Sequence, residues 1–282
     1  LDPNERRLLH RAQIKDVERM SAVYNGGKSV KGGSPNTGIG ASIPRFEDYR
    51  LLTGAGEFSD DFNRPGQAYA AFARGPHAHA RINRVDTDAA GRMPGVIAVL
   101  TGSDYKDDGL NAMLAQGNPK DVELFNRDGS SIYYPRIEPL VSDKVRRVGE
   151  AVAMVVAETA EQAWDAAEVV MADYDILPPV IHLVDALRDG APKLWEDQSS
   201  NLCVDDQKGD AEKVAEIFSI AKHIVRMELR NNRVSGVPME PRAAVGEYNS
   251  RSGVHTLWAG GQGVNRFQRE ISAAFGISDD CV

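Results

Sequence analysis

The chain has 282 residues, of which 42% are hydrophobic and 26% are charged, and its formal net charge at pH 7 is −8. These proportions are ordinary for a globular protein and argue against wholesale disorder. The length predicts two domains, or one large one, with enough residues to bury a core. The acidic excess disfavours binding to nucleic acid or to an anionic membrane surface. No stretch approaches the roughly 20 apolar residues of a bilayer-spanning helix, so we expect no membrane span.

The two cysteines, Cys203 and Cys281, limit the chemistry that the chain can perform. An iron–sulfur cluster needs about four ligands, and two thiols cannot build a disulfide framework. Neither cysteine has a base or a cluster spacing beside it, so both are expected to be inert in a reducing cytoplasm. The charges at the start of the chain are not followed by the apolar core of a signal peptide. Because residue 1 is not Met, we expect the true N-terminus to lie upstream.

Residues 1–40 are predicted to be an extension and linker tethered to the globular part. Residues 1–25 are charged, with scattered apolar positions, whereas residues 25–40 contain six glycines and no apolar pattern. The glycine-rich stretch is typical of a linker. Two interpretations of the extension stay open: a disordered or artificial tail, and a helix that binds a partner.

Residues 41–183 are predicted to form the first globular module, of the α+β class. Ala151 begins seven consecutive apolar residues, which suit a strand buried on both faces. Thr159 and Gln162 have the spacing of a capping box, and a stripe of small apolar residues follows them at helical spacing. The polar stretch 104–131 is expected to be a long insertion or surface loop. The predicted strands are 66–74, 81–85, 95–101, 148–157 and one that begins at Met171 and stops by Pro178, and the helical stripe is Ala163, Ala166, Ala167 and Val170.

Residues 184–282 are predicted to form a second module after a loop at 185–206. Residues 223–230 alternate apolar and charged side chains, which predicts a half-buried strand. Two further strands, 243–248 and 254–259, are expected to pair through a turn. Gly276 stands where a left-handed residue would end the last helix. Asp210 is the expected cap of the first helix, whose stripe is Val214, Ile217, Phe218 and Ala221, and the stripe of the second helix, from about residue 265, is Val264, Phe267, Ile271 and Ala274.

Two polar motifs have structural interpretations that we favour on the residues alone. His77 and His79 would point the same way on a strand and could share a metal, but no third ligand is apparent nearby, so a packing or surface role is preferred. Glu240 and Arg242 in the sequence Met-Glu-Pro-Arg are expected to form an internal ion pair. No Ser-His-Asp grouping can be argued from spacing, so a hydrolase finds no support.

The sequence Gly-Gly-Gln-Gly at 260–263 precedes a predicted helix. Backbone amides at the N-terminus of a helix attract anions, but this spacing fits neither a phosphate-binding loop nor a dinucleotide fingerprint. Gln262 is a neutral donor and acceptor at a strand-to-helix junction. On the residues alone, a simple capping turn is favoured over a functional site.

Several blocks, in the right order, resemble the large subunit of the molybdenum hydroxylases, the family of xanthine dehydrogenase, aldehyde oxidase and aerobic carbon monoxide dehydrogenase. The resemblance spans Ile43 to Val282 and implies an α/β hammerhead domain at 41–183, followed by the first part of a molybdenum-cofactor-binding domain at 184–282. The first domain carries IPRFEDYRLLTGAGEFSDD, GQAYAAFARGPHAHARI, PGVIAVLTGSD and VRRVGEAVAMVVAETAEQAWDAAEVVMADYDILPPV, and the second carries NNRVSGVPMEPRAAVGEY and LWAGGQGVNRFQREISAAFGI.

The resemblance implies an oxidoreductase that inserts water-derived oxygen into a C–H bond of an aldehyde or N-heterocycle, or that oxidises carbon monoxide. It implies a molybdenum–molybdopterin cytosine dinucleotide on this subunit, with 2Fe-2S clusters and FAD on partner subunits. The partners expected are therefore an iron–sulfur subunit, an FAD subunit, the rest of the molybdenum-cofactor domain and a small-molecule substrate. Two cysteines agree with this division, because the clusters must then sit on another chain.

Gln262 matches the family glutamine that forms a hydrogen bond with an oxygen ligand of molybdenum, and the resemblance therefore favours a functional role for it. Gly261 and Gly263 are expected to let the backbone approach the cofactor. Glu240 and Arg242 match a family block, and a structural role near the site is implied for them. No residue of the chain is predicted to bind the metal directly.

The family's loop against the metal, its dinucleotide-binding segments and its catalytic carboxylate would all follow Val282. We therefore expect a fragment or a split-gene product of a larger subunit, which alone does not catalyse. The strand expected after Gly276 would also be missing, which would leave an apolar edge exposed. The alternative hypothesis is a non-catalytic, truncated relative that acts as a scaffold or assembly subunit.

Overall fold

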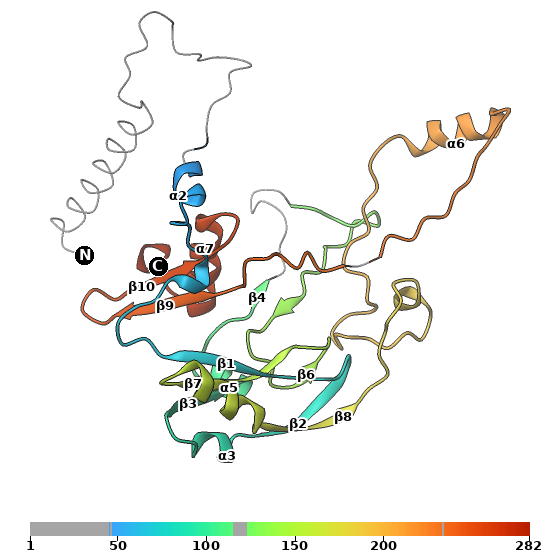
Figure 1. The fold of residues 1–282 in the computed structure, drawn as a ribbon. Helices are drawn as coiled ribbons and strands as arrows, with labels where there is room; N and C mark the ends of the chain where they lie inside the picture. The colour runs from blue at the N-terminus through green and yellow to red at the C-terminus, as the bar shows by residue number, and fades with distance from the viewer. Residues whose placement is uncertain (1–44, 46, 115–122, 233) are drawn as a thin grey trace, which may run out of the picture. The chain divides into compact units, whose positions relative to one another are not determined.

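A computed structural model describes residue 45 and residues 47–114, 123–232 and 234–282 of the chain (Figure 1). The predictions for residues 1–40 lie outside this range. The chain divides into two units, Leu1–Gly56 and Glu57–Val282. In the first unit, the described residues form the short helix α2 (Asp48–Leu52), where the Arg45 side chain donates to Asp48 over 2.8 Å. All of the features that follow belong to the second unit.

The strongest predicted strand is present, and it forms the centre of a three-stranded antiparallel sheet. The order of this sheet is β1 (Tyr69–Arg74), β7 (Ala151–Ala157) and β3 (Val96–Thr101). Helix α5 (Ala160–Glu168) packs on one face, where its buried alanines and Val155 belong to one apolar cluster. The predicted capping box is present, because the Gln162 amide nitrogen donates to Thr159 Oγ1 over 3.2 Å and the Thr159 amide donates to Gln162 Oε1 over 3.1 Å.

A second three-stranded sheet completes the first domain, with the order β6 (Lys144–Val145), β2 (Ala80–Asp86) and β8 (Met171–Ile176). Its core is a cluster of buried apolar side chains, to which the central strand of the other sheet also contributes. The two sheets therefore share one core, as an α+β domain requires. The buried members of this cluster are Ala80, Ile82, Val141, Val145 and Val152.

The stretch 104–131 was expected to be a loop, and that expectation is wrong at its beginning. Helix α4 (Gly102–Asp107) starts there with its own capping box, in which the Thr101 amide donates to Asp104 over 2.7 Å. Hydrogen bonds from Thr101 lower the pKa of Asp104. A turn of helix with both cap residues in place forms even in a polar sequence. The smaller elements of this domain are α3 (Asp88–Gly91), β4 (Met113–Leu114), which pairs with β5 (Arg136–Ile137), and the 3-10 helix η1 (Ser59–Asp61). The 3-10 helix η2 (Asp185–Leu187) follows it, at the beginning of the second module.

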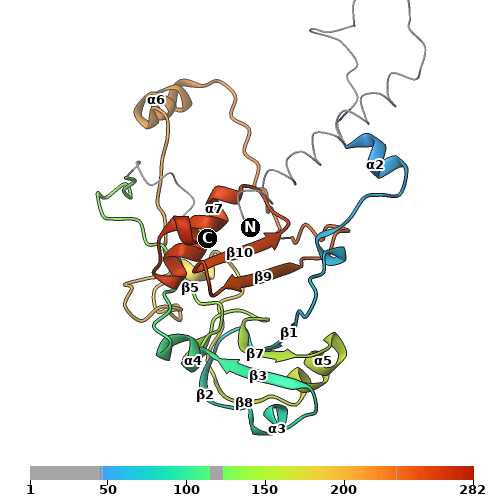
Figure 2. The ribbon, with the colours of Figure 1, turned by 90° about the vertical axis from the view of Figure 1, so that its left-hand side faces the viewer.

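The second module contains the predicted strand pair and both predicted helices. Strands β9 (Ala244–Asn249) and β10 (Val254–Ala259) form an antiparallel hairpin beside helix α7 (Val264–Phe275), as Figure 2 shows. Gly276 follows α7 with φ 66°, the left-handed conformation expected at this end. Helix α6 (Ala211–Ile220) begins at the predicted cap, where Asp210 accepts from the Lys213 amide over 2.9 Å, and η3 (Asp279–Cys281) closes the described chain.

The predicted strand at 223–230 is wrong in this structure. These residues form neither helix nor strand, and side chains of both the apolar and the charged set are exposed. An alternating pattern makes a strand only where another strand accepts its backbone hydrogen bonds, and none of the described strands pairs with it. Among the described helices, none is long and apolar enough to cross a lipid bilayer.

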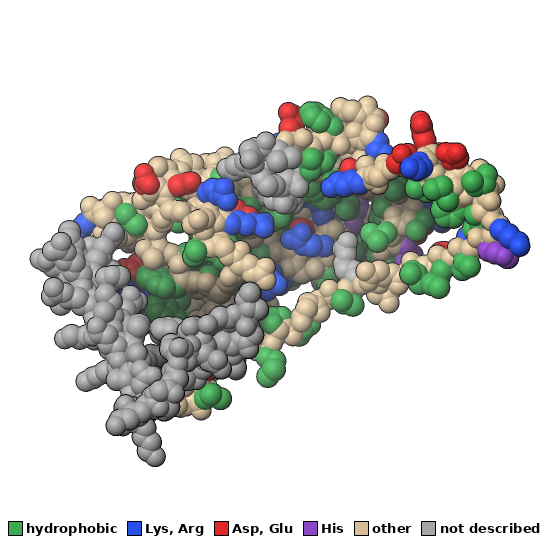
Figure 3. Space-filling view, turned by 90° about the horizontal axis from the view of Figure 1, so that it is seen from above, with side chains coloured by type: hydrophobic (Ala, Val, Ile, Leu, Met, Phe, Trp, Pro, Cys, Tyr) green, Lys and Arg blue, Asp and Glu red, His purple; other side chains and the backbone are tan. Residues whose placement is uncertain are grey.

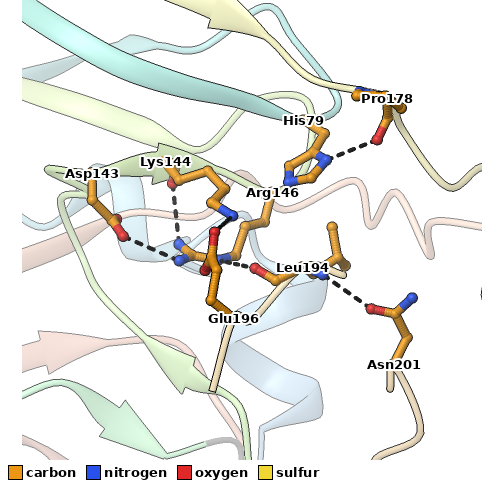
Figure 4. Close-up of polar contacts among 8 residues, drawn as sticks. All are labelled: His79, Asp143, Lys144, Arg146, Pro178, Leu194, Glu196 and Asn201. Carbon is orange, nitrogen blue, oxygen red and sulfur yellow. Dashed lines mark hydrogen bonds and ion pairs between the residues drawn. The ribbon is translucent and has the colours of Figure 1, made fainter. Parts of the chain in front are cut away.

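The two modules are joined by a connecting segment. A polar cluster anchors this segment on the first domain (Figure 4). Lys144, whose side chain is 4% exposed, donates to the carboxylate of Glu196. The Arg146 guanidinium donates to the Leu194 carbonyl over 3.0 Å and lies 5.8 Å from the Trp195 ring. Asn201 then fixes the segment by accepting from the Leu194 amide over 3.0 Å. A buried ammonium group without this carboxylate would be costly, so the pair holds the connecting segment in one place.

We predict that Gly102→Ala destabilises the fold. A Cβ atom at Gly102 would lie 2.5 Å from the backbone carbon of Val141, and backbone cannot move aside cheaply. The expected loss in the free energy of unfolding is about 1–3 kcal/mol, measured by chemical denaturation. The matched control is Gly91→Ala, where a Cβ meets nothing within 4 Å. An equal loss in both variants would contradict the steric argument.

Glu196→Gln is predicted to lower stability at neutral pH and to reduce its acid dependence. The hydrogen bond from Lys144 holds the pKa of Glu196 below its usual value. The stability that this pair contributes is therefore complete above the unfolded-state pKa and disappears as pH falls through the lowered folded-state pKa. Because 65% of the Glu196 side chain is exposed, screening limits the expected loss to about 1 kcal/mol.

Unfolding curves of both proteins between neutral and acidic pH test this prediction. Asp206→Asn is the control, since its pair with Lys208 is exposed on both sides. If acidification lowers the free energy of unfolding of the wild type by no more than that of the Glu196 variant, the stabilising role of the Lys144–Glu196 pair is contradicted.

Candidate functional site

The predicted site residues lie in the turn between β10 and α7. Gln262 and its two flanking glycines are exposed, and the described structure gives Gln262 no hydrogen-bonding partner. Gly263 is the residue before the helix, with φ 105°, a conformation that side chains rarely permit. The side-chain amide of Gln262 is therefore free to donate or accept a hydrogen bond outside the chain.

Each glycine of this turn has a steric reason in the chain itself. A Cβ at Gly260 would lie 2.8 Å from the hydroxyl oxygen of Ser59, and one at Gly261 would lie 2.3 Å from the ring of Phe267. Gly263 needs its positive φ. The turn therefore presents Gln262 as its one side chain above a bare backbone. Close approach of the backbone to a cofactor stays a prediction for Gly261 and Gly263.

The expected ion pair between Glu240 and Arg242 does not form within the described part of the chain. Glu240 instead accepts two hydrogen bonds from Ser59, one from its amide and one from its hydroxyl, both over 3.0 Å. The two residues precede β9 and lie in no strand, so the strand geometry that would place them side by side is missing. The carboxylate fixes a distant segment next to Gly260.

This distant segment, residues 57–67, is called the strap. Its Phe62 ring stacks on Trp258 of β10, with 5.3 Å between the ring centroids. Its Arg64 guanidinium lies 4.9 Å from the centroid of the same indole and forms an ion pair with Glu247 of β9 over 3.2 Å. Sequence reasoning assigned no role to these residues, although two aromatic residues and one arginine were the available signal. The strap holds the hairpin from which the glutamine turn emerges.

Helix α7 supports the other side of the turn. Phe267 touches Gly261, and one turn further on the buried hydroxyl of Ser272 donates to the carboxylate of Asp279. Gln268 donates to the carbonyl oxygens of Asp279 and Val282 over 2.8 and 3.0 Å. These contacts hold η3 against α7. The helix therefore contacts the glutamine turn near its beginning and η3 further along its length.

His77 and His79 make packing contacts, and both cysteines are partly buried. The Nδ1 atom of His79 donates to the Pro178 carbonyl over 2.8 Å, and His77 lies edge-on to Tyr174 at 5.0 Å. Burial raises the pKa of the Cys203 thiol, which disfavours the reactive thiolate. No group of three or more His, Cys, Asp or Glu side chains that could hold a metal ion occurs among the described residues.

Two family models match consecutive parts of the chain. The model described as "Aldehyde oxidase and xanthine dehydrogenase, a/b hammerhead domain" matches residues 53–178. The model described as "Molybdopterin cofactor-binding domain" matches residues 194–282. The segment between the two matches contains η2, and the residues anchored by Lys144 and Arg146 begin the second match.

Several known proteins are similar to this chain over most of its length. The nicotine 6-hydroxylase large subunit of Paenarthrobacter nicotinovorans is 34% identical over 79% of this chain and 26% of its own length. The carbon monoxide dehydrogenase large chain of Afipia carboxidovorans is 30% identical over 86% of this chain and 29% of its own length. The crystal structure of quinoline 2-oxidoreductase from Pseudomonas putida 86 superposes with a TM-score of 0.74, at 30% identity, over 88% of this chain and 30% of that one. The chain thus spans less than a third of each of these relatives.

We predict that Gly261→Ala disturbs the glutamine turn. The new methyl group would overlap the ring of Phe267, so either the turn or the N-terminal end of α7 must shift. The expected result is a loss of about 1–3 kcal/mol in the free energy of unfolding, with altered fluorescence of Trp258 on the adjacent strand.

Gly246→Ala is the matched control for this variant, because a Cβ in the middle of β9 meets nothing within 4 Å. Thermal unfolding and tryptophan emission of both variants are the measurements. A Gly261 variant that behaves like the Gly246 variant would show that the turn tolerates a side chain.

Proposed function

Because the chain belongs to the molybdenum hydroxylase family and matches the N-terminal part of its large subunits, we propose that it is the N-terminal portion of a molybdenum-cofactor-binding oxidoreductase subunit. The proposed reaction is hydroxylation of a C–H bond with water-derived oxygen, or the oxidation of carbon monoxide. The observation that carries this proposal is the bare turn that presents Gln262, built within the matched cofactor-binding domain.

The names of the similar proteins support a narrow range of substrates. Nicotine, quinoline and nicotinate, which these names contain, are N-heterocycles, whereas the carbon monoxide dehydrogenases act on carbon monoxide. Aldehyde oxidoreductases are also among the solved structures with this fold. We propose an N-heterocycle, an aldehyde or carbon monoxide as the substrate. Most of each relative lies outside the matched part, so the residues that select among them belong to the remainder.

The residues present fit a molybdopterin cofactor at this turn. The backbone of 260–263 carries no side chain except Gln262, which leaves room for a planar, polar group to approach. The cofactor would supply two-electron oxidation and oxygen transfer when bound, and we propose its cytosine dinucleotide form. Gln262 would orient it by donating through its side-chain nitrogen or accepting through its side-chain oxygen, while the strap and α7 support the backbone of the turn that carries it.

The electrons released by such a reaction need acceptors that two cysteines cannot provide. We propose that 2Fe-2S clusters and FAD lie on partner subunits, and that the complex works in the cytoplasm. The rest of the cofactor-binding domain, in cis or in trans, would complete the pocket. The chain without these partners is expected to be inactive.

The test replaces Gln262 with Ala in the purified complex. Loss of an orienting hydrogen bond next to a metal centre typically costs about 10- to 100-fold in activity, so we expect turnover to fall at least tenfold with the molybdenum content unchanged. Asn265→Ala is the matched control, since it removes another exposed amide three residues away and should leave turnover within twofold.

Metal analysis and pterin fluorescence of the wild-type complex complete the experiment. Equal turnover in both variants would refute the role of Gln262. A stable complex that carries neither molybdenum nor pterin would refute the enzymatic proposal and favour the scaffold hypothesis. Full activity from a monomeric 30.7 kDa chain would refute the need for a completing segment.

A further inference from the structure

The two modules differ sharply in how much apolar surface they bury. Among the described residues, every buried hydrophobic side chain lies at or before Ala167, with the single exception of Ala274 in α7. The first domain therefore has a core of its own. The described part of the second module has almost none, although a domain needs one to be stable. Within the described part of the chain, its apolar residues therefore have almost no apolar surface to pack against.

Helix α6 shows the same deficit locally. Three of the four predicted stripe residues, Val214, Ile217 and Phe218, lie in the helix, whereas Ala221 follows its end in an extended conformation. These three side chains are each more than half exposed, and no residue of the helix is buried. A helix of ten residues is marginal in water by itself and is usually stabilised by packing of its apolar face. The stripe therefore indicates a docking face that no described residue of the chain covers.

The segment after α6 has the pattern of a strand without a partner strand. Val225, Met227 and Leu229 alternate with Arg226, Glu228 and Arg230, and these three apolar side chains are between 76% and 89% exposed. Residues 223–230 have no hydrogen bonds to other residues of the described chain. We call residues 211–230 the arm, and Figure 3 shows hydrophobic side chains gathered along this part of the surface.

We infer that the arm docks on the remainder of the cofactor-binding domain, a strand of which pairs with residues 223–230 while its apolar surface covers α6. This inference rests on the proposed function. The arm lies inside the stretch that matches the cofactor-binding domain, and the chain covers only 26–29% of the nicotine 6-hydroxylase and carbon monoxide dehydrogenase large chains. A segment of chain long enough to provide both a sheet and a core surface is therefore expected beyond the matched part.

A strand partner fits the chemistry of the arm better than the other occupants. Charges of both signs alternate with the apolar residues, which suits a sheet with one face buried and one face in water. A second copy of the arm would supply only a two-stranded ribbon, which is marginally stable and would leave both α6 stripes uncovered. A larger sheet that also covers α6 satisfies both features together.

Hydrogen exchange on the complete molybdenum complex, purified through a tag on this chain, tests the inference. We expect amides in peptides from 223–230 to exchange at least 100-fold more slowly than in an unstructured peptide, because a strand pair protects them. The same peptides of the 282-residue chain alone should exchange within tenfold of the unstructured rate. Unprotected amides in the complex would overturn the proposal.

A pair of variants tests the face that docks. Met227→Gln removes an apolar side chain from the docking face, and Glu228→Gln places the same residue on the opposite face. Met227→Gln should reduce the yield of assembled complex at least tenfold, Met227→Leu should restore it, and Glu228→Gln should leave it within twofold. Equal effects of the two glutamine variants would overturn the assigned face, whereas the exchange measurement does not depend on either variant.

The identity of the partner is tested with a benzoylphenylalanine photo-crosslinker in place of Phe218. Mass spectrometry should find crosslinked peptides from the remainder of the cofactor-binding domain. Crosslinks to the arm of a second copy, or to an iron–sulfur or flavin subunit, would overturn the inference. Molybdenum content is measured on the same preparation. A metal-loaded complex with a freely exchanging arm refutes only the docking, and a protected arm without metal refutes only the proposed function.

Discussion

The two hydrogen bonds from Ser59 to Glu240 are the contact on which the candidate site depends. They join residues that are 181 positions apart, and they place the strap directly against Gly260. The stacking of Phe62 on Trp258 then fixes the hairpin below the turn. A hydrogen bond to an ionised acceptor such as a carboxylate is stronger than a hydrogen bond between two neutral groups. The position of Gln262 is thereby set by the beginning of the first domain as well as by its own neighbours.

This arrangement supports the turn that carries Gln262 from two sides. The anchored connection at Lys144 and Glu196 and the strap at Ser59 tie the second module to the first at two separate places. The first domain can hold both ties because its sheets share a buried core. The second module depends on these ties for its position, since it buries almost no apolar side chain of its own among the described residues. These ties hold the backbone that carries Gln262, whose exposed side chain makes no hydrogen bond to the described residues.

The features that the sequence predicts well are those encoded over a few neighbouring residues. The capping box at Thr159, the cap at Asp210 and the left-handed Gly276 all depend on contacts within four positions, and all three are present. Helix α4 is also predictable from the sequence, since Thr101 and Asp104 have the spacing of a capping box. The polar residues around it favour the prediction of a loop instead. The strap was not readable, because no periodicity relates Ser59 to Glu240. The role of Gln262 itself rests on the resemblance and stays a prediction.

The strand predicted at 223–230 is wrong for the same physical reason that the predicted helices are correct. Alternation of apolar and charged residues describes which side chains are buried in the finished structure, whichever chain provides the opposite surface. Where that surface belongs to the same chain, as for α5, pattern and burial agree. Where the described part of the chain offers no such surface, the helix still forms from local contacts, as α6 does, but a strand does not, because its hydrogen bonds are all made to a neighbour. A strand pattern that stays unpaired beside an uncovered helix is therefore informative about a missing partner, and it indicates which face of the arm that partner must contact.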